Sequence, residues 1–166
     1  MAKPNPWDSY THYMLLKKQI SATEYIDNIN EHAFLGDLKG SIVSMSPNFK
    51  FQEYDLELPD DNGKLQKIHF NELKAFYDAI TKNFVGSAYG IRLNNEKYAL
   101  SKYDADKKIG YFSKKDGGAS IALTNSMVIF ASYNTKLQGG DKIHQNVGQC
   151  NLAVEKLAML LKASKY

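Results

Sequence analysis

Several residue types that would assign a class of protein are scarce in this 166-residue chain. It has one cysteine, Cys150, so no disulfide can form within the chain. The N-terminal residues MAKPNPWDSY contain no apolar signal core, and no run of about 18 or more apolar residues is long enough to cross a bilayer. We therefore expect a cytosolic protein that is not an integral membrane protein.

The charge is small and spread along the chain. The 21 basic and 18 acidic residues leave a formal net charge of +3. A nucleic-acid-binding protein usually gathers its basic residues into one run or on one face, so we expect no nucleic-acid partner. A hydrophobic content of 43% and a charged content of 23% suit one globular domain over residues 1–166.

Patterns that carry enzyme chemistry are also missing. The four histidines lie in different predicted elements, and none has a second histidine at a spacing that would pair the two on a metal ion; they are His12, His32, His69 and His144. No nucleophile elbow, phosphate-binding glycine loop or dinucleotide fingerprint occurs. Cys150 is either a nucleophile or an inert buried thiol, and its place on an apolar helix stripe favours the inert thiol. We expect no enzymatic activity, no metal site and no cofactor.

The last stretch, residues 144–166, is the clearest element in the sequence. Its apolar residues recur at spacings of three and four, which predicts one buried helix face formed by Cys150, Ala153, Val154, Leu157, Ala158 and Leu161. Asn146 can cap this helix, with Gln149 as its capping-box partner, so the helix should begin near residue 147. A second line is either more core or faces a partner: Leu152, Met159 and Tyr166.

The N-terminal residues Asn5–Asp8 have the order of a helix start: a cap, a proline at the first helical position and an acidic residue in the first turn. The predicted helix continues to about Gln19. Aromatic residues recur along it at every third position: Trp7, Tyr10 and Tyr13. They are either core residues or exposed flat faces, and the pattern alone favours the core.

The middle of the chain indicates a sheet. Two short strands are expected over residues 32–35 and 41–46, followed by a protruding hairpin around the turn Asp60–Gly63. Asn71 can cap an amphipathic helix that continues to about Phe84. From Gly86 to Tyr133 the apolar period changes to two, with Tyr89 in the first of five short strands, which predicts an antiparallel meander. The order describes an α+β domain whose terminal helices can share one sheet face.

Two surfaces are candidates for binding. Exposed aromatic residues at the two ends of the chain would suit a proline-rich ligand, which is already extended and loses little entropy on docking. Lysines at the ends and turns of the middle strands can converge on an acidic partner or a phosphoinositide head group, or they form an ordinary solvated face. These are Lys97, Lys102, Lys107, Lys108, Lys114 and Lys115.

Four segments resemble the profilin family. Residues 148–157, GQCNLAVEKL, resemble the C-terminal helix of plant and fungal profilins, and Trp7-Asp8-Ser9-Tyr10 resembles the start of the N-terminal helix of the family. Residues 90–98, GIRLNNEKY, and residues 113–118, SKKDGG, resemble two of its strand turns. The hairpin of YDLELPDDNG resembles the extra arm of some protozoan profilins. The order and spacing agree over nearly the whole chain.

The resemblance implies a profilin-like antiparallel β-sheet with the N- and C-terminal helices on one face, a mid-chain helix on the other and an inserted β-hairpin arm over about residues 52–69. It also implies two partners. Monomeric actin would bind Lys97, Lys102, Lys115, Gly148 and Asn151, with the Tyr54-to-Ile68 arm touching it. Proline-rich segments of formin-type proteins would bind Trp7, Tyr10 and Tyr166.

This chain departs from the pattern of the family at several positions. Val43 aligns with a second tryptophan, and Leu160 aligns with an aromatic residue or histidine, so we expect weaker or differently selective poly-proline binding. Asn94-Asn95 replaces paired glycines, and Leu152 stands where vertebrate profilins carry a lysine. The hypothesis is a cytoplasmic, cytoskeletal regulator of actin polymerisation. The alternative is a small-molecule-sensing or scaffold domain of similar layers, which a pocket inside the sheet lined by tyrosine and histidine would favour.

Overall fold

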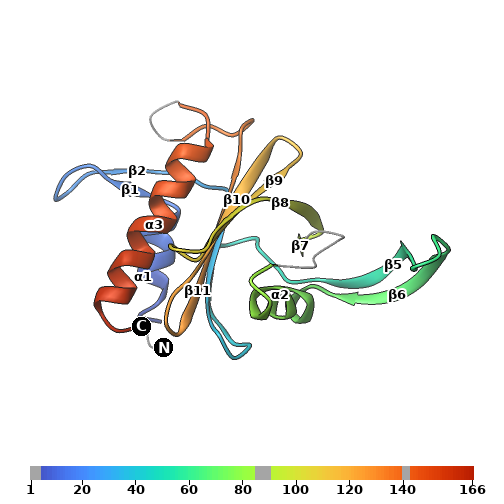
Figure 1. Ribbon diagram of the computed structural model, residues 1–166. Coiled ribbons are helices and arrows are strands. Elements are labelled where there is room, and N and C mark those ends of the chain that lie inside the picture. The colour runs from blue at the N-terminus through green and yellow to red at the C-terminus, as the bar shows by residue number, and fades with distance from the viewer. Residues whose placement is uncertain (1–4, 85–90, 140–142) are drawn as a thin grey trace.

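The structure, a computed structural model, describes residues 5–84, 91–139 and 143–166. Its centre is an antiparallel sheet. Within the described residues, seven strands are hydrogen-bonded in the order β4-β3-β11-β10-β9-β8-β7. The N-terminal helical segment and α3 (Val147–Ala163) cover one face, and α2 (Glu72–Thr81) packs on the other (Figure 1). This confirms the predicted α+β, profilin-like arrangement. No helix of the described ranges is both long and apolar enough to span a membrane.

The sheet contains the strands that the sequence pattern predicted. The first two are β3 (His32–Asp37) and β4 (Ile42–Met45). The meander consists of β7 (Ile91–Leu93), β8 (Glu96–Asp104), β9 (Ile109–Lys114), β10 (Gly117–Leu123) and β11 (Met127–Asn134). The predicted beginning of the meander, with Tyr89 and Gly90, lies outside the described residues.

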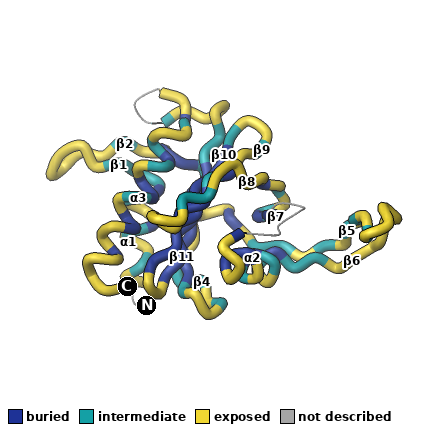
Figure 2. Tube along the Cα trace, in the orientation of Figure 1, coloured by how far each residue is buried: buried dark blue, intermediate teal, exposed yellow. Residues whose placement is uncertain are grey.

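The core has two sides because neighbouring residues of a strand point to opposite faces. Ile121 pairs with Phe130, and both belong to the cluster under α2. The next pair, Ala122 and Ile129, belongs to the cluster under α3. Burying each large apolar side chain contributes about 1.5 to 3 kcal/mol, so both helical layers are held by the same central strands. The buried residues of these strands form the dark centre of the molecule in Figure 2.

The closing helix α3 buries the stripe that its sequence predicted, from Cys150 to Leu161. Asn146 caps it, because its side-chain oxygen accepts a hydrogen bond from the Gln149 N–H at 3.0 Å. The prediction that the Gln149 side chain completes a capping box is wrong. Gln149 Oε1 is buried and has no hydrogen-bond partner within the described part of the chain. The second line is solvent-facing, since Met159 is 71% exposed and Leu152 and Tyr166 are also exposed.

The N-terminal helix is shorter than predicted. It comprises α1 (Asp8–Tyr10) and a π-helical turn, η1 (Thr11–Leu15), and does not reach Gln19. Ile29 N–H donates to the Leu16 carbonyl and the Asn30 amide donates to the Leu15 carbonyl, so the last turn bonds to another segment. The chain then forms a small hairpin that the sequence pattern did not indicate, β1 (Lys18–Gln19) with β2 (Tyr25–Ile26).

Helix α2 begins as predicted and ends early. Asn71 caps it by accepting a hydrogen bond from the Lys74 N–H at 3.0 Å. The helix ends at Thr81 rather than Phe84, because Asn83 and Phe84 have positive φ angles of 51° and 65° that a right-handed helix cannot contain. The Phe84 ring is nevertheless buried in the cluster under α2.

The predicted hairpin is present as β5 (Glu53–Pro59) and β6 (Leu65–Asn71), and it projects from the body beyond α2 (Figure 1). Gly63 in its turn has a φ of +79°, which glycine adopts without steric cost. Apolar pairs line one side of the hairpin, with Tyr54 opposite Phe70 and Leu56 opposite Ile68. Its outer part is largely exposed (Figure 2).

Candidate binding surfaces

Three aromatic residues from the two ends of the chain meet beside α3. The Trp7 ring lies 5.7 Å from the Tyr10 ring and 5.2 Å from the Tyr166 ring, the latter at an interplanar angle of 82°. Both distances are typical of favourable aromatic pairs. We call Trp7, Tyr10 and Tyr166 the aromatic cluster. The structure therefore brings together the three residues expected at a poly-proline site.

Polar contacts hold the two ends of the chain in this position. Ser44 on β4 donates a hydrogen bond to Asp8 Oδ1 at 2.6 Å, and its oxygen lies 2.8 Å from Thr11 Oγ1. This chain of contacts joins the first helical turn to the edge strand. At the other end, the Asn125 N–H donates to the Tyr166 carbonyl at 3.1 Å, so the last residue is attached to the β10–β11 turn.

The rings of the aromatic cluster are neither fully buried nor fully exposed. Trp7 and Tyr10 are half-buried at the margin of the core under α3, and Tyr166 is 44% exposed. The Trp7 and Tyr10 rings therefore each have one part that packs against the core and another part that is accessible to a ligand. At the two departures from the pattern of the family, Val43 is half-buried on β4 and Leu160 is exposed on α3.

The expected actin-binding residues lie along neighbouring elements. Lys102 on β8 pairs with Tyr111 on β9, which pairs with Ser120 on β10. The Ser120 hydroxyl donates to Asn151 Oδ1 on α3 at 2.5 Å. Paired residues of adjacent strands share a sheet face, so this row connects Lys102 to the first turns of α3.

The remaining expected residues extend the same surface. Lys97 is exposed on β8 and Lys115 is exposed in the β9–β10 turn. Ala99 pairs with Ser113, and extending this register by two residues sets Lys97 opposite Lys115. Gly148 is exposed in the first turn of α3, one turn before Asn151. We call Lys97, Lys102, Lys115, Gly148 and Asn151 the basic face.

Lys114 is not available to this surface, which corrects its place in the candidate basic set. Its side chain is 2% exposed, and its ammonium lies 2.8 Å from Glu31 and 3.0 Å from Glu96. Burial opposes the charged form, but Tyr98 and the two carboxylates outweigh this and raise the pKa of Lys114. The residue therefore stabilises the fold from the α2 side of the sheet.

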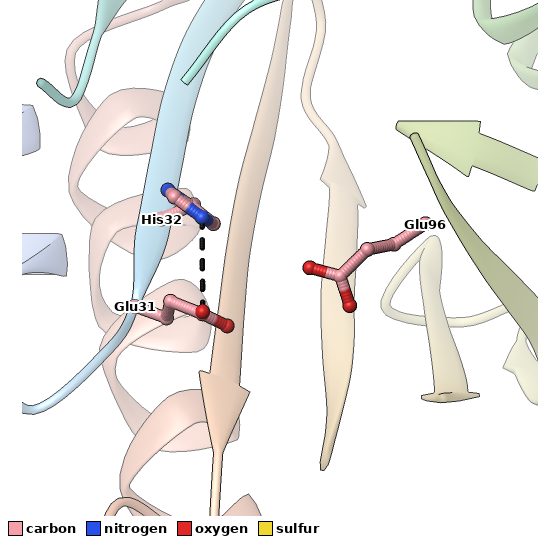
Figure 3. A group of neighbouring side chains, drawn as sticks. All are labelled: Glu31, His32 and Glu96. Atoms are coloured by element: carbon pink, nitrogen blue, oxygen red, sulfur yellow. Dashed lines mark ion pairs between the residues drawn. The ribbon is translucent and has the colours of Figure 1, made fainter. Parts of the chain in front are cut away.

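The same network contains a group of residues with metal-ligand chemistry. The ligand atoms of Glu31, His32 and Glu96 lie within 4.8 Å of one another, and Glu96 reaches toward the other two from a different strand (Figure 3). The Lys114 ammonium already supplies a positive charge within ion-pair distance of both carboxylates. Burial lowers the pKa of His32. We assign the group to a structural ion-pair network.

A second buried charge, Glu72, joins the hairpin to the sheet. The residue has 0% exposure, and its Oε1 accepts hydrogen bonds from the Gln52 and Asn94 N–H groups, both at 2.8 Å. Its Oε2 accepts from the Tyr54 hydroxyl at 2.7 Å and from the Asn95 N–H at 2.9 Å. The sequence does not indicate this role, since a glutamate in a first helical turn is ordinarily exposed and interacts with the helix dipole.

The Glu72 contacts also explain a departure from the pattern of the family. Asn94 and Asn95 have φ angles of 52° and 63°, the left-handed conformation that a two-residue hairpin turn requires. Asparagine adopts this conformation more readily than other non-glycine residues. Two asparagines therefore form the turn in place of paired glycines, and their N–H groups bind one carboxylate.

Cys150 lies in the core under α3. Its Sγ is 3.3 Å from the Ala131 carbonyl oxygen, to which it donates. Burial raises the pKa of the thiol to about 12. A thiol that stays protonated and inaccessible is a poor nucleophile, which agrees with the inert role favoured by the sequence.

Comparisons with known proteins identify the family. The Profilin family model matches residues 5–166. The chain belongs to the profilin family. Profilins are generally actin-binding proteins.

Individual relatives agree with this assignment along almost the whole chain. A profilin of Tetrahymena pyriformis is 31% identical over 96% of this chain and 98% of its own length. Acanthamoeba castellanii profilin IA superposes with a TM-score of 0.65 at 19% identity, covering 96% of this chain and 99% of that chain. Schizosaccharomyces pombe profilin superposes with a TM-score of 0.64 at 16% identity and the same coverage. The two solved structures support the fold.

Proposed function

We propose that this profilin is a cytoplasmic adaptor of the actin cytoskeleton that binds an actin monomer through the basic face and a proline-rich segment through the aromatic cluster. The observation that carries the proposal is the meeting of Trp7, Tyr10 and Tyr166, which come from opposite ends of the chain and keep part of each ring accessible. Membership of a generally actin-binding family supports actin as a partner.

The aromatic cluster suits proline-rich segments such as those of formin-type proteins. Pyrrolidine rings pack on flat aromatic faces, and a polyproline helix is extended before it binds. Val43 and Leu160 offer aliphatic surface in place of two further ring systems and contribute no side-chain hydrogen-bond donor. We therefore expect poly-proline to bind more weakly than it binds profilins that carry those rings.

Calorimetric titration with a formin-type proline repeat tests this site. Trp7→Ala and Tyr166→Ala should each reduce the affinity about tenfold or more, because aromatic anchors dominate such contacts. Tyr166 is the better probe, since it is 44% exposed at the last position and its loss should leave the fold intact. An affinity unchanged in both variants would refute the site.

The basic face suits the acidic surface of an actin monomer. The basic face carries three exposed lysines, so electrostatic steering and pairing at the rim would favour association. Whether the same lysines also bind phosphoinositide head groups is measured by sedimentation with vesicles that contain or lack these lipids. Polymerisation of pyrene-labelled actin with the purified protein tests the main proposal, and an unchanged polymerisation curve at high protein concentration contradicts it.

The hairpin arm would add a further actin contact. Through Glu72 its base is joined to the Asn94–Asn95 turn, two residues before Lys97 of the basic face. A two-stranded hairpin is marginally stable in isolation, and Leu65 and Ile68 are exposed on this one. Replacing residues 55–67 by Asn-Gly should weaken actin sequestration without unfolding the domain. An unaltered actin affinity in the folded variant would remove the arm from the interface.

A further inference from the structure

The aromatic cluster stands at one end of a longer seam between two helices. The N-terminal segment and α3 run antiparallel, so both termini lie at the same end of the molecule (Figure 1). Along the N-terminal segment, Tyr13 and Met14 follow Tyr10 at helical spacings of three and four. Along α3, a line at the same spacing leads back from Leu160 through Lys156 to Leu152. The seam therefore connects the aromatic cluster to the opposite end of the helical layer.

A cavity of about 260 Å³ lies at that opposite end, between η1, β1 and α3. Its apolar lining includes Tyr13, Met14 and Leu152, and its cationic groups are Lys17, Lys18 and Lys156. We call it the basic pocket. Lys17 forms an ion pair with the exposed Asp27 at 3.2 Å. Lys18 and Lys156 have no ion pair with any of the described residues, and none of the residues that line the pocket is acidic.

The chemistry of the basic pocket selects one kind of occupant. Its volume is below the range of about 300 to 1,000 Å³ that is typical of small-molecule sites, so one apolar side chain fills it better than a whole cofactor does. Lysines around an apolar floor favour carboxylates on either side of that group. An apolar residue flanked by aspartate or glutamate, within a peptide, has these properties.

We propose that a proline-rich ligand continues from the aromatic cluster along the seam and inserts an acidic-flanked apolar residue into the basic pocket. This inference rests on the proposed proline site and names the sequence that it prefers. Leu152 and Leu160 are eight positions apart on α3, which is about 12 Å along the helix axis. A polyproline helix advances about 3.1 Å per residue, so about four residues separate the last bound proline from the anchor.

Calorimetric titration of the full chain with matched peptides tests the inference. The first peptide is decaproline, and the second adds Asp-Phe-Asp after a spacer of about four residues. A third carries Lys-Phe-Lys instead, and the acidic and basic anchors are also placed before the prolines. We expect an acidic anchor on one side to raise the affinity about five- to tenfold, and the basic anchor to give no gain. The gain should shrink at high salt.

Two variants and their matched controls locate the effect. Lys156→Gln and Leu152→Asn should remove most of the gain from the acidic anchor and leave decaproline binding unchanged. Lys74→Gln, on the far face of the sheet, and Met159→Asn, outside the basic pocket on α3, should retain the gain. A gain that persists in Lys156→Gln and Leu152→Asn overturns the inference.

The peptide series separates this inference from the proposed function. If decaproline binds but neither position of the acidic anchor raises the affinity, the basic pocket is not part of the proline site and this inference alone fails. If decaproline and the anchored peptides do not bind at all, the proposed proline site fails, and the inference fails with it.

Discussion

Neighbouring charged residues of β8 and β9 serve two different regions of this molecule. Glu96 reaches the ion-pair network on the α2 side, whereas the next residue, Lys97, is exposed on the basic face. Lys114 is buried in the network, whereas Lys115 is exposed in the following turn. Charged residues at adjacent positions therefore have opposite surroundings, one in the buried network and the next in solvent.

The difference shows that one strand can supply residues to two separate regions of the molecule. Alternate side chains point to opposite faces, so one run of charged residues can stabilise the fold with one set and face a partner with the other. A buried ion pair contributes little in net terms, but removing one member leaves an uncompensated charge. An exposed lysine costs little to lose. Substitutions in the two regions should consequently affect different measurements.

The largest expected effect follows the loss of the buried ammonium. Lys114→Met should lower the free energy of unfolding by about 3 kcal/mol, because the carboxylates of Glu31 and Glu96 lose their shared cation. Urea denaturation measures the change. Lys115→Met is the control one residue along, and it should change stability by less than about 0.5 kcal/mol. Equal losses in the two variants would contradict the division between the regions.

A somewhat smaller loss is expected at the other buried charge. Glu72→Gln keeps the shape of the side chain but replaces one carboxylate oxygen by an NH₂ group. That group cannot accept the hydrogen bonds that the backbone N–H groups donate to the carboxylate. This should cost about 2 kcal/mol and loosen the base of the hairpin. Hydrogen exchange should rise first at Asn94 and Asn95. Tyr54→Phe, which removes only the hydroxyl donor, is the milder control.

The sequence predicted the fold better than it predicted these charges. Periodicity identifies the stripe of α3 and the strands of the meander, because their burial follows a regular spacing. The resemblance to profilins added which face each helix covers. It also named the aromatic cluster, whose rings the structure brings together from opposite ends of the chain.

The sequence did not predict the roles of residues whose partners are distant along the chain. The burial of Lys114 requires Glu31 from the segment before β3, and the role of Glu72 requires the backbone of the β7–β8 turn. Nothing within a few residues of either position indicates these contacts. The early end of the N-terminal helix likewise depends on Asn30, which bonds to the Leu15 carbonyl.

The network should also make stability depend on pH. Burial lowers the pKa of His32 below its ordinary 6.5, so the unfolded chain takes up a proton first and stability falls as the pH drops through that value. For Glu31, burial opposes ionisation but Lys114 outweighs it and lowers the pKa below 4.5, which extends the loss to more acidic solution. Urea midpoints measured from about pH 7 to pH 4 should therefore decrease.

A group outside the network provides a control of opposite sign. Glu53 and Asp55 raise the pKa of the exposed His69 on the hairpin, so its contribution is complete below 6.5 and is lost as the pH rises. His69→Gln should thus steepen the net loss of stability on acidification, and Glu31→Gln should flatten its most acidic part. Midpoints that rise on acidification would exclude the network as the dominant titrating region.

Substitutions on the basic face should have the smallest effect on stability. They test the exposed region through actin binding instead. Replacing Lys97, Lys102 or Lys115 singly by glutamine removes a rim charge and should weaken actin binding about twofold each, mainly through slower association. The triple variant should approach a tenfold loss at low salt and converge with the wild type at high salt, because only screened charge has been removed. Lys39→Gln removes the same charge from the exposed β3–β4 turn and should retain full affinity. If Lys39→Gln weakens actin binding as much as the basic-face variants do, net charge rather than this surface controls the association, and the contrast with the buried network no longer identifies a binding site.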